Sequence, residues 1–389
     1  MAPWVVYLVT FLMGVIAIFA FMVPSQLAVI WIERRVIGRF QIRWGPNRVG
    51  PFGLLQPIAD AIKVLAKEAT TPAAADKWVF WLAPIATFVP AIMVYAVFPF
   101  APGMVLSDLN VGLLYIIALS SLSAIVVFMA GWSSNNKFSL LGAMRAVAQM
   151  VSYEIPMVLS VVGVVLLAGS LQMSRIVEAQ IESGAWFLLL QPLGFLLFFV
   201  CAVSELNRTP MDIMEAESEI VAGYHTEYSG MKFSLFYAAE YTNSLAVAAV
   251  ITTLFLGGWS SVPWLDRIAE ATGLWWLNRI VPPWAWFIGK IYFLFFVLVW
   301  LRATFPRLRI DQLMAFAWKF LLPLALANVF ITGLEILVWE NTAAPPPLAI
   351  PLLVVINFSL TVVLIVGWAR LLGAKWIAAP SPLVEAPDA

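Results

Sequence analysis

The sequence has very few residues that bind metals or redox cofactors. Among its 389 residues there is one cysteine, Cys201, and one histidine, His225. An iron–sulfur cluster is usually held by four cysteines, haem needs suitable axial ligands, and zinc needs three or four ligands at workable spacing. The chain also lacks a glycine fingerprint that follows a strand and opens a helix, so we expect no dinucleotide site. We therefore expect no metal site and no redox cofactor bound by this chain.

Charge is also scarce. Only 11% of the residues are charged, 62% are hydrophobic, and the mean hydropathy is +0.93. Soluble domains average about 25% charged residues, so this chain could not cover a surface that faces water. Lipid must be its main solvent. The net charge of zero argues against a nucleic-acid partner.

Apolar segments recur along the chain, and each is long enough to cross a bilayer of about 30 Å as a helix. The sequence predicts an all-α integral membrane protein with one multi-spanning domain over residues 1–377 and a disordered cytoplasmic tail over 378–389. The nine predicted spans are 4–31, 78–99, 112–131, 152–169, 186–204, 234–258, 284–303, 319–339 and 347–369.

Loop charges predict the orientation. If the odd-numbered loops and the C-terminus share one side, that side carries eighteen Lys and Arg residues, and the other side carries only Arg175, Arg267 and Arg279. Positive charges favour the cytoplasmic side. We therefore expect the N-terminus outside, and the loop after residue 204 and the C-terminus in the cytoplasm.

The first of these cytoplasmic loops predicts a short amphipathic helix that opens at Pro57 and runs to about Glu68. Leucine and isoleucine side chains form one face, and Asp60 and Lys63 belong to the polar face. Such a helix is expected at the membrane surface. It could serve as a surface anchor or as one wall of a chamber for an amphipathic ligand, and periodicity does not separate these two readings.

Carboxylates are concentrated between residues 205 and 233 and continue into the next span. Glu240 lies about 10 Å inside that span, and Glu205 is on the last turn of the preceding one. Carboxylates at membrane depth are costly and indicate an ion or proton route. Glu154, which opens another span, is a weaker candidate. The remaining acidic residues of the loop are Asp212, Glu215, Glu217, Glu219 and Glu227, against only two basic residues, Arg208 and Lys232.

Thr209 and Pro210 resemble a helix start, so a helix is predicted over about 210–222. An ordinary solvated acidic helix is the alternative reading of Glu215, Glu217 and Glu219. We interpret His225 as a packing or hydrogen-bonding group rather than a pH switch, and Cys201 as inert packing.

Several long motifs resemble the family of H subunits of NADH:quinone oxidoreductase, respiratory complex I. The resemblance covers roughly residues 25–335. The ninth span departs from it, since many members stop after eight helices, and Ser121 stands where some relatives have a membrane glutamate. The matching motifs are ERR at 33–35, GPNRVGPFGLLQPIADAIK at 45–63, KE at 67–68, GW at 131–132, LLGAMRAVAQMVSYEI at 140–155, the acidic loop, LFLGGW at 254–259, RATFPRLRIDQLM at 302–314 and WKFLLPLALAN at 318–328.

The resemblance implies a quinone-binding membrane subunit of a proton-translocating enzyme in the bacterial inner membrane. It implies quinone as substrate, with FMN and iron–sulfur clusters in partner subunits, and no catalytic residue on this chain alone. The implied partners are peripheral-arm quinone-site and iron–sulfur subunits, small membrane subunits and antiporter-like subunits, as well as lipid. The implied quinone-site residues are Arg34, Asp60, Arg208 and Asp212, with Lys63 on the same polar face as Asp60. The implied proton path is Glu154, Glu205, Glu215, Glu217, Glu219, Glu227 and Glu240.

Three other functions are compatible with parts of the pattern. The acidic loop alone would suit the homologous membrane subunit of a membrane-bound hydrogenase, although the motif at 45–60 favours the quinone enzyme. A free-standing ion transporter would be active as a single chain. A purely structural anchor would not need carboxylates at membrane depth.

Overall fold

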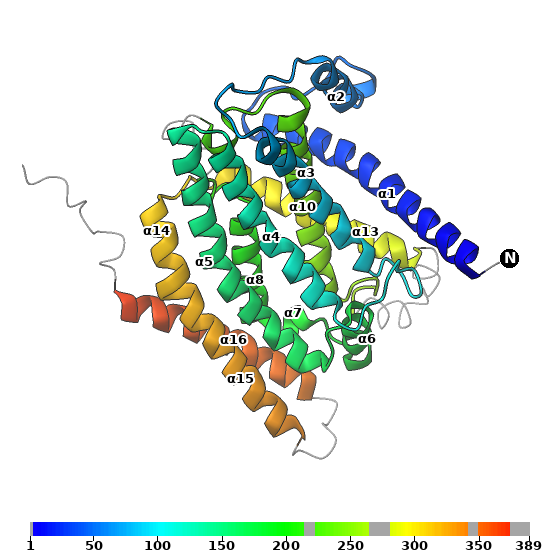
Figure 1. Cartoon of the computed structure of the whole chain (residues 1–389). Coiled ribbons are helices and arrows are strands. Elements are labelled where there is room, and N and C mark those ends of the chain that lie inside the picture. Colours follow the sequence, from blue (N-terminus) through cyan, green and yellow to red (C-terminus); the bar gives the residue numbers. More distant parts are fainter. Residues whose placement is uncertain (1–2, 214–221, 264–280, 341–348, 374–389) are drawn as a thin grey trace, which may run out of the picture.

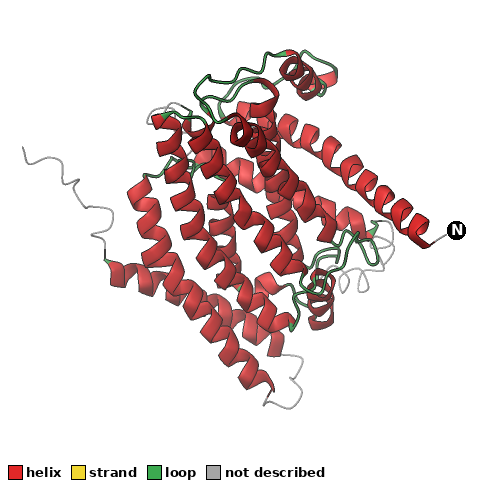
Figure 2. Ribbon diagram, viewed as in Figure 1, coloured by secondary structure: helices red, strands yellow, loops and turns green. Residues whose placement is uncertain are grey.

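The computed structural model describes residues 3–213, 222–263, 281–340 and 349–373. Within these ranges the regular structure is helical and contains no β-strand (Figure 2). Seven of the described helices are long and apolar enough to cross a membrane. The all-α membrane architecture predicted from the sequence is therefore confirmed.

Each predicted span contains a helix (Figure 1). Three short elements are continuous with these helices. The 3-10 turn η2 (Val94–Val97) follows α3, and α14 (Ile310–Ala315) and the π-helical segment η4 (Phe316–Leu321) precede α15. The helices are α1 (Pro3–Phe40), α3 (Lys77–Met93), α4 (Gly112–Ser133), α5 (Lys137–Ala168), α8 (Pro192–Glu205), α10 (Gly230–Phe255), α13 (Pro283–Thr304), α15 (Leu322–Glu340) and α16 (Ala349–Leu372).

Some helix bounds differ from the predicted ones. Helix α5 begins at Lys137 rather than near residue 152, because Asn136 caps it by accepting a hydrogen bond from the Phe138 N–H at 3.0 Å. The predicted segment 186–204 is divided into α7 (Phe187–Leu190) and α8, since Pro192 has no N–H to continue a helix. Helix α6 (Met173–Ser183) was not predicted.

The short amphipathic helix is present as α2 (Gln56–Ala66), with Pro57 in its first turn. The side chains of Ile58, Ile62 and Leu65 are 42–66% exposed, so the apolar face expected to contact lipid is uncovered by this chain. Helix α2 lies at one end of the bundle, and α6 and α16 lie at the other (Figure 1).

The prediction of a helix over 210–222 is wrong for the first residues of that range. Residues 210–213 are not helical, and 214–221 lie outside the described residues. Tertiary contacts override the local start signal. The Leu308 N–H donates to the Pro210 carbonyl at 3.0 Å, and Asp212 pairs with Arg307 instead of capping a helix.

Helix α5 lies in the middle of the bundle and packs against α4, α8 and α15. Small residues allow the close approaches that membrane helices use in place of hydrophobic driving force. A Cβ added to Gly142 would lie 2.8 Å from the Gly223 Cα, so this helix touches the backbone of the acidic loop. The loop region is thereby held against the inner face of α5.

Candidate functional site

Arg208, in the turn after α8, is the most deeply buried cation of the site. Its side chain is 2% exposed. Its Nε donates to Glu240 Oε1 on α10 at 3.0 Å, and its Nη1 donates to Glu33 Oε2 on α1 at 3.4 Å. Burial disfavours the charged guanidinium, but the charges of Glu33 and Glu240 outweigh burial and raise the pKa of Arg208 above its usual value.

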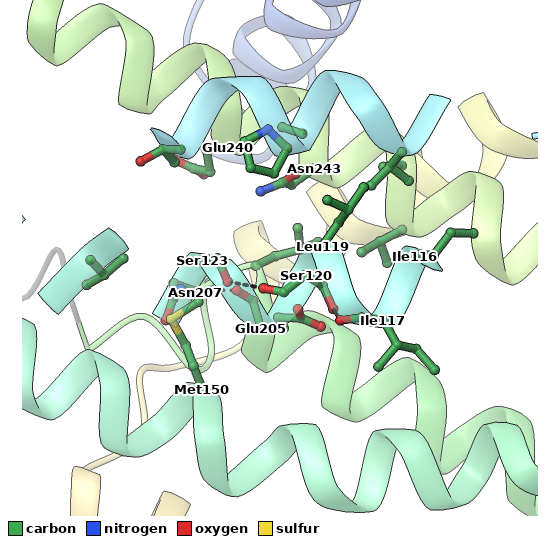
Figure 3. Close-up of a pocket in the computed structure, with 18 of the residues that line it drawn as sticks. Ile116, Ile117, Leu119, Ser120, Ser123, Met150, Glu205, Asn207, Glu240 and Asn243 are labelled. Atoms are coloured by element: carbon green, nitrogen blue, oxygen red, sulfur yellow. Dashed lines mark hydrogen bonds between the residues drawn. The ribbon is translucent and has the colours of Figure 1, made fainter. Parts of the chain in front are cut away.

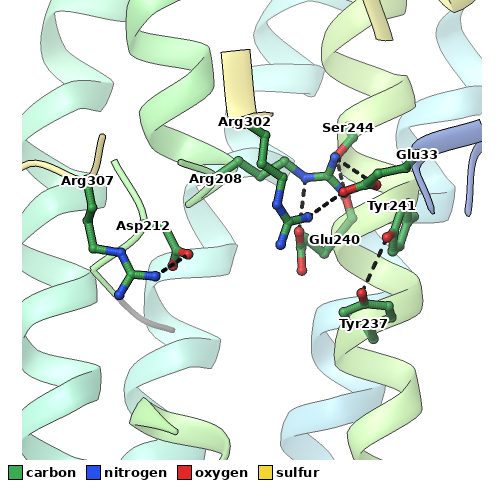
Figure 4. Close-up of polar contacts among 9 residues, drawn as sticks. All are labelled: Glu33, Arg208, Asp212, Tyr237, Glu240, Tyr241, Ser244, Arg302 and Arg307. Atoms are coloured by element: carbon green, nitrogen blue, oxygen red, sulfur yellow. Dashed lines mark hydrogen bonds and ion pairs between the residues drawn. The ribbon is translucent and has the colours of Figure 1, made fainter. Parts of the chain in front are cut away.

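Arg302 of α13 completes this buried charge cluster, defined as Glu33, Arg208, Glu240 and Arg302. Its Nη1 donates to the second oxygen of Glu33 at 2.5 Å. The Arg208 guanidinium also lies 4.8 Å from the ring centroid of Tyr241. Two cations and two carboxylates from three helices and a turn therefore meet inside the bundle (Figure 4).

Asp212 forms a separate pair. Its carboxylate accepts from Arg307 Nη2 at 3.1 Å, and Figure 4 shows this pair apart from the buried charge cluster. The pair and the cluster nevertheless involve the same two chain segments, because Asp212 follows Arg208 in the loop after α8, and Arg307 follows Arg302, which is in the last turn of α13. The Asp212–Arg307 pair thus ties the same two segments together at a second point.

A third group lies at the α2 end of the bundle, between α1 and α2. Arg34 donates a hydrogen bond to Asp60, Gln56 donates to the same carboxylate at 3.1 Å, and Lys63 Nζ lies 3.7 Å from it. Burial alone would raise the pKa of Asp60, but these hydrogen bonds and cations lower it. Because Glu33 and Arg34 are consecutive on α1, this surface group adjoins the buried charge cluster.

A partly open cavity of about 150 Å³ lies between α3, α4, α5, α8 and α10, and most of its lining is apolar. Glu205 and Glu240 approach it from two sides (Figure 3). The Glu205 carboxyl group is hydrogen-bonded to the Ser120 side chain, and Glu154, a second acidic residue, is close enough to interact with it electrostatically. The polar lining residues are Thr87, Ser120, Ser123, Glu205, Asn207, Tyr224, His225, Tyr237, Glu240 and Asn243.

Glu240 belongs to both features, since it pairs with Arg208 and also lines the cavity. A change in the charge of the cluster therefore acts on a carboxyl group that lines the cavity. Within the described residues, no three His, Cys, Asp or Glu side chains are placed to hold a metal ion.

His225, in the turn η3 (Gly223–His225), is another lining residue of the cavity. Its ring contacts Tyr224 and Phe233, with centroids 4.9 and 5.3 Å apart. Burial lowers the pKa of His225 to about 4, so the imidazole is neutral near pH 7. Its aromatic contacts fit the predicted packing role, while its place at the cavity was not anticipated.

The structure brings together some of the residues singled out in the sequence. Arg208 contacts Glu240, Arg34 and Lys63 surround Asp60, and Glu205 lies near Glu154. Glu227 instead accepts from Asn136 Nδ2 at 2.7 Å and is not among the residues that line the cavity. Glu215, Glu217 and Glu219 lie outside the described residues.

Sequence reasoning did not select Glu33 and Arg302 as site residues. Both stand inside motifs that carried the family resemblance, in ERR at 33–35 and in RATFPRLRIDQLM at 302–314. Each also ends a long apolar span, where a charge is easily read as an interfacial anchor. The available signal was that Glu33 and Arg302 carry opposite charges and that each stands at the end of an apolar span. The sequence alone does not show that these two charges contact one another.

The comparisons with known proteins agree with this resemblance. The family model described as NADH dehydrogenase matches residues 13–333. Two relatives named as the H subunit of NADH-quinone oxidoreductase come from Dehalococcoides mccartyi. The one from strain CBDB1 is 59% identical over 84% of this chain and 87% of its own length, and the one from strain 195 is 54% identical over 95% and 97%. A third relative with this name, from Carboxydothermus hydrogenoformans, is 48% identical over 85% and 90%.

The low pKa of His225 predicts a pH dependence of stability. In the unfolded chain the imidazole takes up a proton near pH 6.5, whereas in the folded chain it does so only near pH 4. The contribution of the neutral imidazole to the free energy of unfolding is therefore full above about pH 6.5. It is lost as the pH falls toward 4, and the loss is up to about 3 kcal/mol. We expect thermal unfolding in detergent to show a smaller loss over this interval for His225→Gln. An unchanged pH slope in that variant would contradict the buried neutral imidazole.

Proposed function

The chain belongs to the NADH dehydrogenase family, and the relatives reported above are named as H subunits of NADH-quinone oxidoreductase, so we propose a role in quinone reduction. In this proposal the chain forms the membrane wall of the quinone chamber and the acidic path that couples quinone reduction to proton pumping. In this proposal the FMN and the iron–sulfur clusters belong to peripheral partner subunits, and small and antiporter-like membrane subunits are neighbours. Residues 1–377 form one membrane domain, in the bacterial inner membrane.

The chamber is assigned to the group between α1 and α2. The exposed apolar face of α2 suits the tail of a quinone, which arrives from the bilayer. The polar stripe of Gln56, Asp60 and Lys63 lies beside Arg34, so hydrogen-bond donors and acceptors are available for a ring with carbonyl groups. Asp212 and Arg208 would support the chamber from the loop after α8 rather than contact the ring first.

The coupling is assigned to the buried charge cluster. Reduction of a quinone to a quinol takes two electrons and two protons, so charge appears in the chamber until the protons arrive. Two unit charges about 4 Å apart interact by ~4 kcal/mol at an effective dielectric of 20. Glu33 is the residue next to Arg34, and Arg208 connects Glu33 to Glu240. A charge at the surface group can thus alter the proton affinity of Glu240 through short contacts.

The proposal is carried by one observation, namely that Glu240 belongs both to the buried charge cluster and to the lining of the cavity. Its carboxyl group touches Arg208 on one side and lines the cavity, with Glu205, on the other. A structural ion pair has no need of the cavity. The names of the relatives favour this reading over a hydrogenase component or a free-standing transporter.

The proposed orientation puts the loop after α4 in the cytoplasm and the segment before α4 outside. Lys137 and Asn110 flank this helix and are exposed, and the native Cys201 is buried. In intact cells an impermeant thiol reagent should label Asn110→Cys and leave Lys137→Cys unlabelled until the membrane is opened. Labelling of Lys137→Cys from outside would reverse the topology.

The quinone site predicts a selective loss of activity. Asp60→Asn keeps the shape of the side chain but weakens its contacts with Arg34 and Lys63, so quinone reduction by the assembled complex should fall by about tenfold, near 1.4 kcal/mol. NADH oxidation with an artificial soluble acceptor should be unchanged, since that acceptor bypasses the chamber. Glu178→Gln, which alters the exposed Arg175–Glu178 pair on α6, is the matched control. Normal quinone reduction in assembled Asp60→Asn would remove this group from the site.

The coupling proposal predicts that one change stops two processes. Glu240→Gln keeps size and hydrogen bonding but removes the titrating group, so quinone turnover and proton pumping per assembled complex should fall together. The exposed Glu182→Gln on α6 should leave both unchanged. Wild-type turnover and pumping in Glu240→Gln would show that the carboxylate is only structural.

A further inference from the structure

A second set of buried polar side chains lies at the end of the bundle opposite α2. Gln191, Asn328 and Asn357 are 3–5% exposed. Each has an amide atom that meets no hydrogen-bonding partner within the described part of the chain: Gln191 Oε1, Asn328 Nδ2 and Asn357 Oδ1. Leaving such an atom unpaired inside a protein is unfavourable, so three together require an explanation.

The break between α7 and α8 organises this set. Asn357 of α16 donates through Nδ2 to the Leu190 carbonyl at 2.6 Å, next to the Pro192 that interrupts the helix. Gln191 Nε2 donates to Thr332 Oγ1 on α15 at 2.7 Å. Side chains of neighbouring helices thus bond to the polar groups at the break, as membrane-depth helix breaks require.

Two glycines make room for the amides. A Cβ at Gly163 of α5 would lie 2.9 Å from Gln191 Nε2 and 3.0 Å from Asn328 Nδ2, and one at Gly194 of α8 would lie 3.2 Å from Asn328 Nδ2. The Gln191 and Asn328 amides therefore lie together over the bare backbone of these two helices. An unpaired acceptor, Gln191 Oε1, and an unpaired donor, Asn328 Nδ2, face this same spot.

The set is separate from the cavity described above. Gln191 and Glu205 are at opposite ends of α8, about 20 Å apart at 1.5 Å per residue. None of the three amide residues lines that cavity. The set therefore needs an occupant of its own.

Glu335 adds a carboxyl group to the set. It is half-buried on α15, and its Oε2 accepts from Asn357 Nδ2 at 3.4 Å. Across the described ranges, no Lys or Arg pairs with it. A carboxyl group at membrane depth without a cation is least costly in its protonated form.

Water fits the unpaired atoms better than direct pairing does. If Asn328 Nδ2 turned to one amide oxygen, the other oxygen would stay unpaired. Over the two glycines a water molecule can donate to Gln191 Oε1 and accept from Asn328 Nδ2, and water beside the Leu190 carbonyl can donate to Asn357 Oδ1.

We propose that Gln191, Asn328 and Asn357 hold bound water in this end of the bundle, and that Glu335 is a protonated carboxyl group that exchanges its proton with that water. In the exchange the carboxyl O–H bond breaks, the proton joins a water molecule, and it returns by the reverse step. Helix α16, the ninth predicted span, completes the site by supplying Asn357. This proposal does not depend on the quinone chamber or on the acidic path.

The first test is infrared difference spectroscopy of the purified complex on transfer from H2O to D2O. The wild type should show a protonated-carboxyl band that shifts on deuteration, and Glu335→Gln should lack it. Asn357→Leu should slow the exchange about tenfold, because it removes a hydrogen bond worth about 1.4 kcal/mol. Ser359→Ala, an exposed position on the same helix, is the control. An unchanged band in assembled Glu335→Gln, or none in the wild type, overturns the proposal.

The second test needs no variant. A high-resolution cryo-electron microscopy map of the wild-type complex should show ordered density within hydrogen-bond distance of Gln191 Oε1 and Asn357 Oδ1. Amide side chains bonded directly to one another, with no density between them, would overturn the site even if a variant fails to assemble.

Discussion

Arg208 places a guanidinium group where α1, α10 and α13 meet, and it stays charged there because Glu33 and Glu240 face it. Breaking a buried ion pair from one side leaves an uncompensated charge and costs about 3–5 kcal/mol. The turn after α8 must therefore keep its path, and the three helices must keep their spacing. The Asp212–Arg307 pair and the contact of Gly142 with Gly223 hold the neighbouring backbone in the same arrangement.

The charge balance of the cluster is the physical basis of the coupling role that we propose for it. With both carboxylates ionised, two cations and two anions compensate each other. A proton gained by Glu240 leaves a net positive charge beside the cavity, and the Coulomb energy of that change extends to Glu205 and the surface group. In the proposed coupling role, such a set would respond to charge by moving protons rather than helices, which is compatible with a densely packed bundle.

The sequence predicted the architecture well, because apolar spans of about twenty residues specify helices strongly. It also selected Glu240 as a candidate from its depth in a span. It did not pair Glu33 with Arg208, which is 175 residues away, or Glu33 with Arg302, which is 269 residues away. The helix predicted from Pro210 failed for a similar reason, since contacts with the segment around Leu308 decide that backbone. Pairings across the bundle are tertiary facts, and local patterns do not encode them.

Helix α1 has a mechanical consequence. It is 38 residues long, about 57 Å at 1.5 Å per residue, so it extends past the roughly 30 Å hydrocarbon layer. Glu33 and Arg34 follow its internal Pro24 on one continuous stretch of helix, and their side chains point about 100° apart. Glu33 pairs with Arg208 in the bundle interior, and Arg34 pairs with Asp60 of α2. This stretch of α1 is a rigid helix with a contact at each of two adjacent residues. A displacement of α2 that moves Arg34 must therefore rotate or shift Glu33 by a comparable amount.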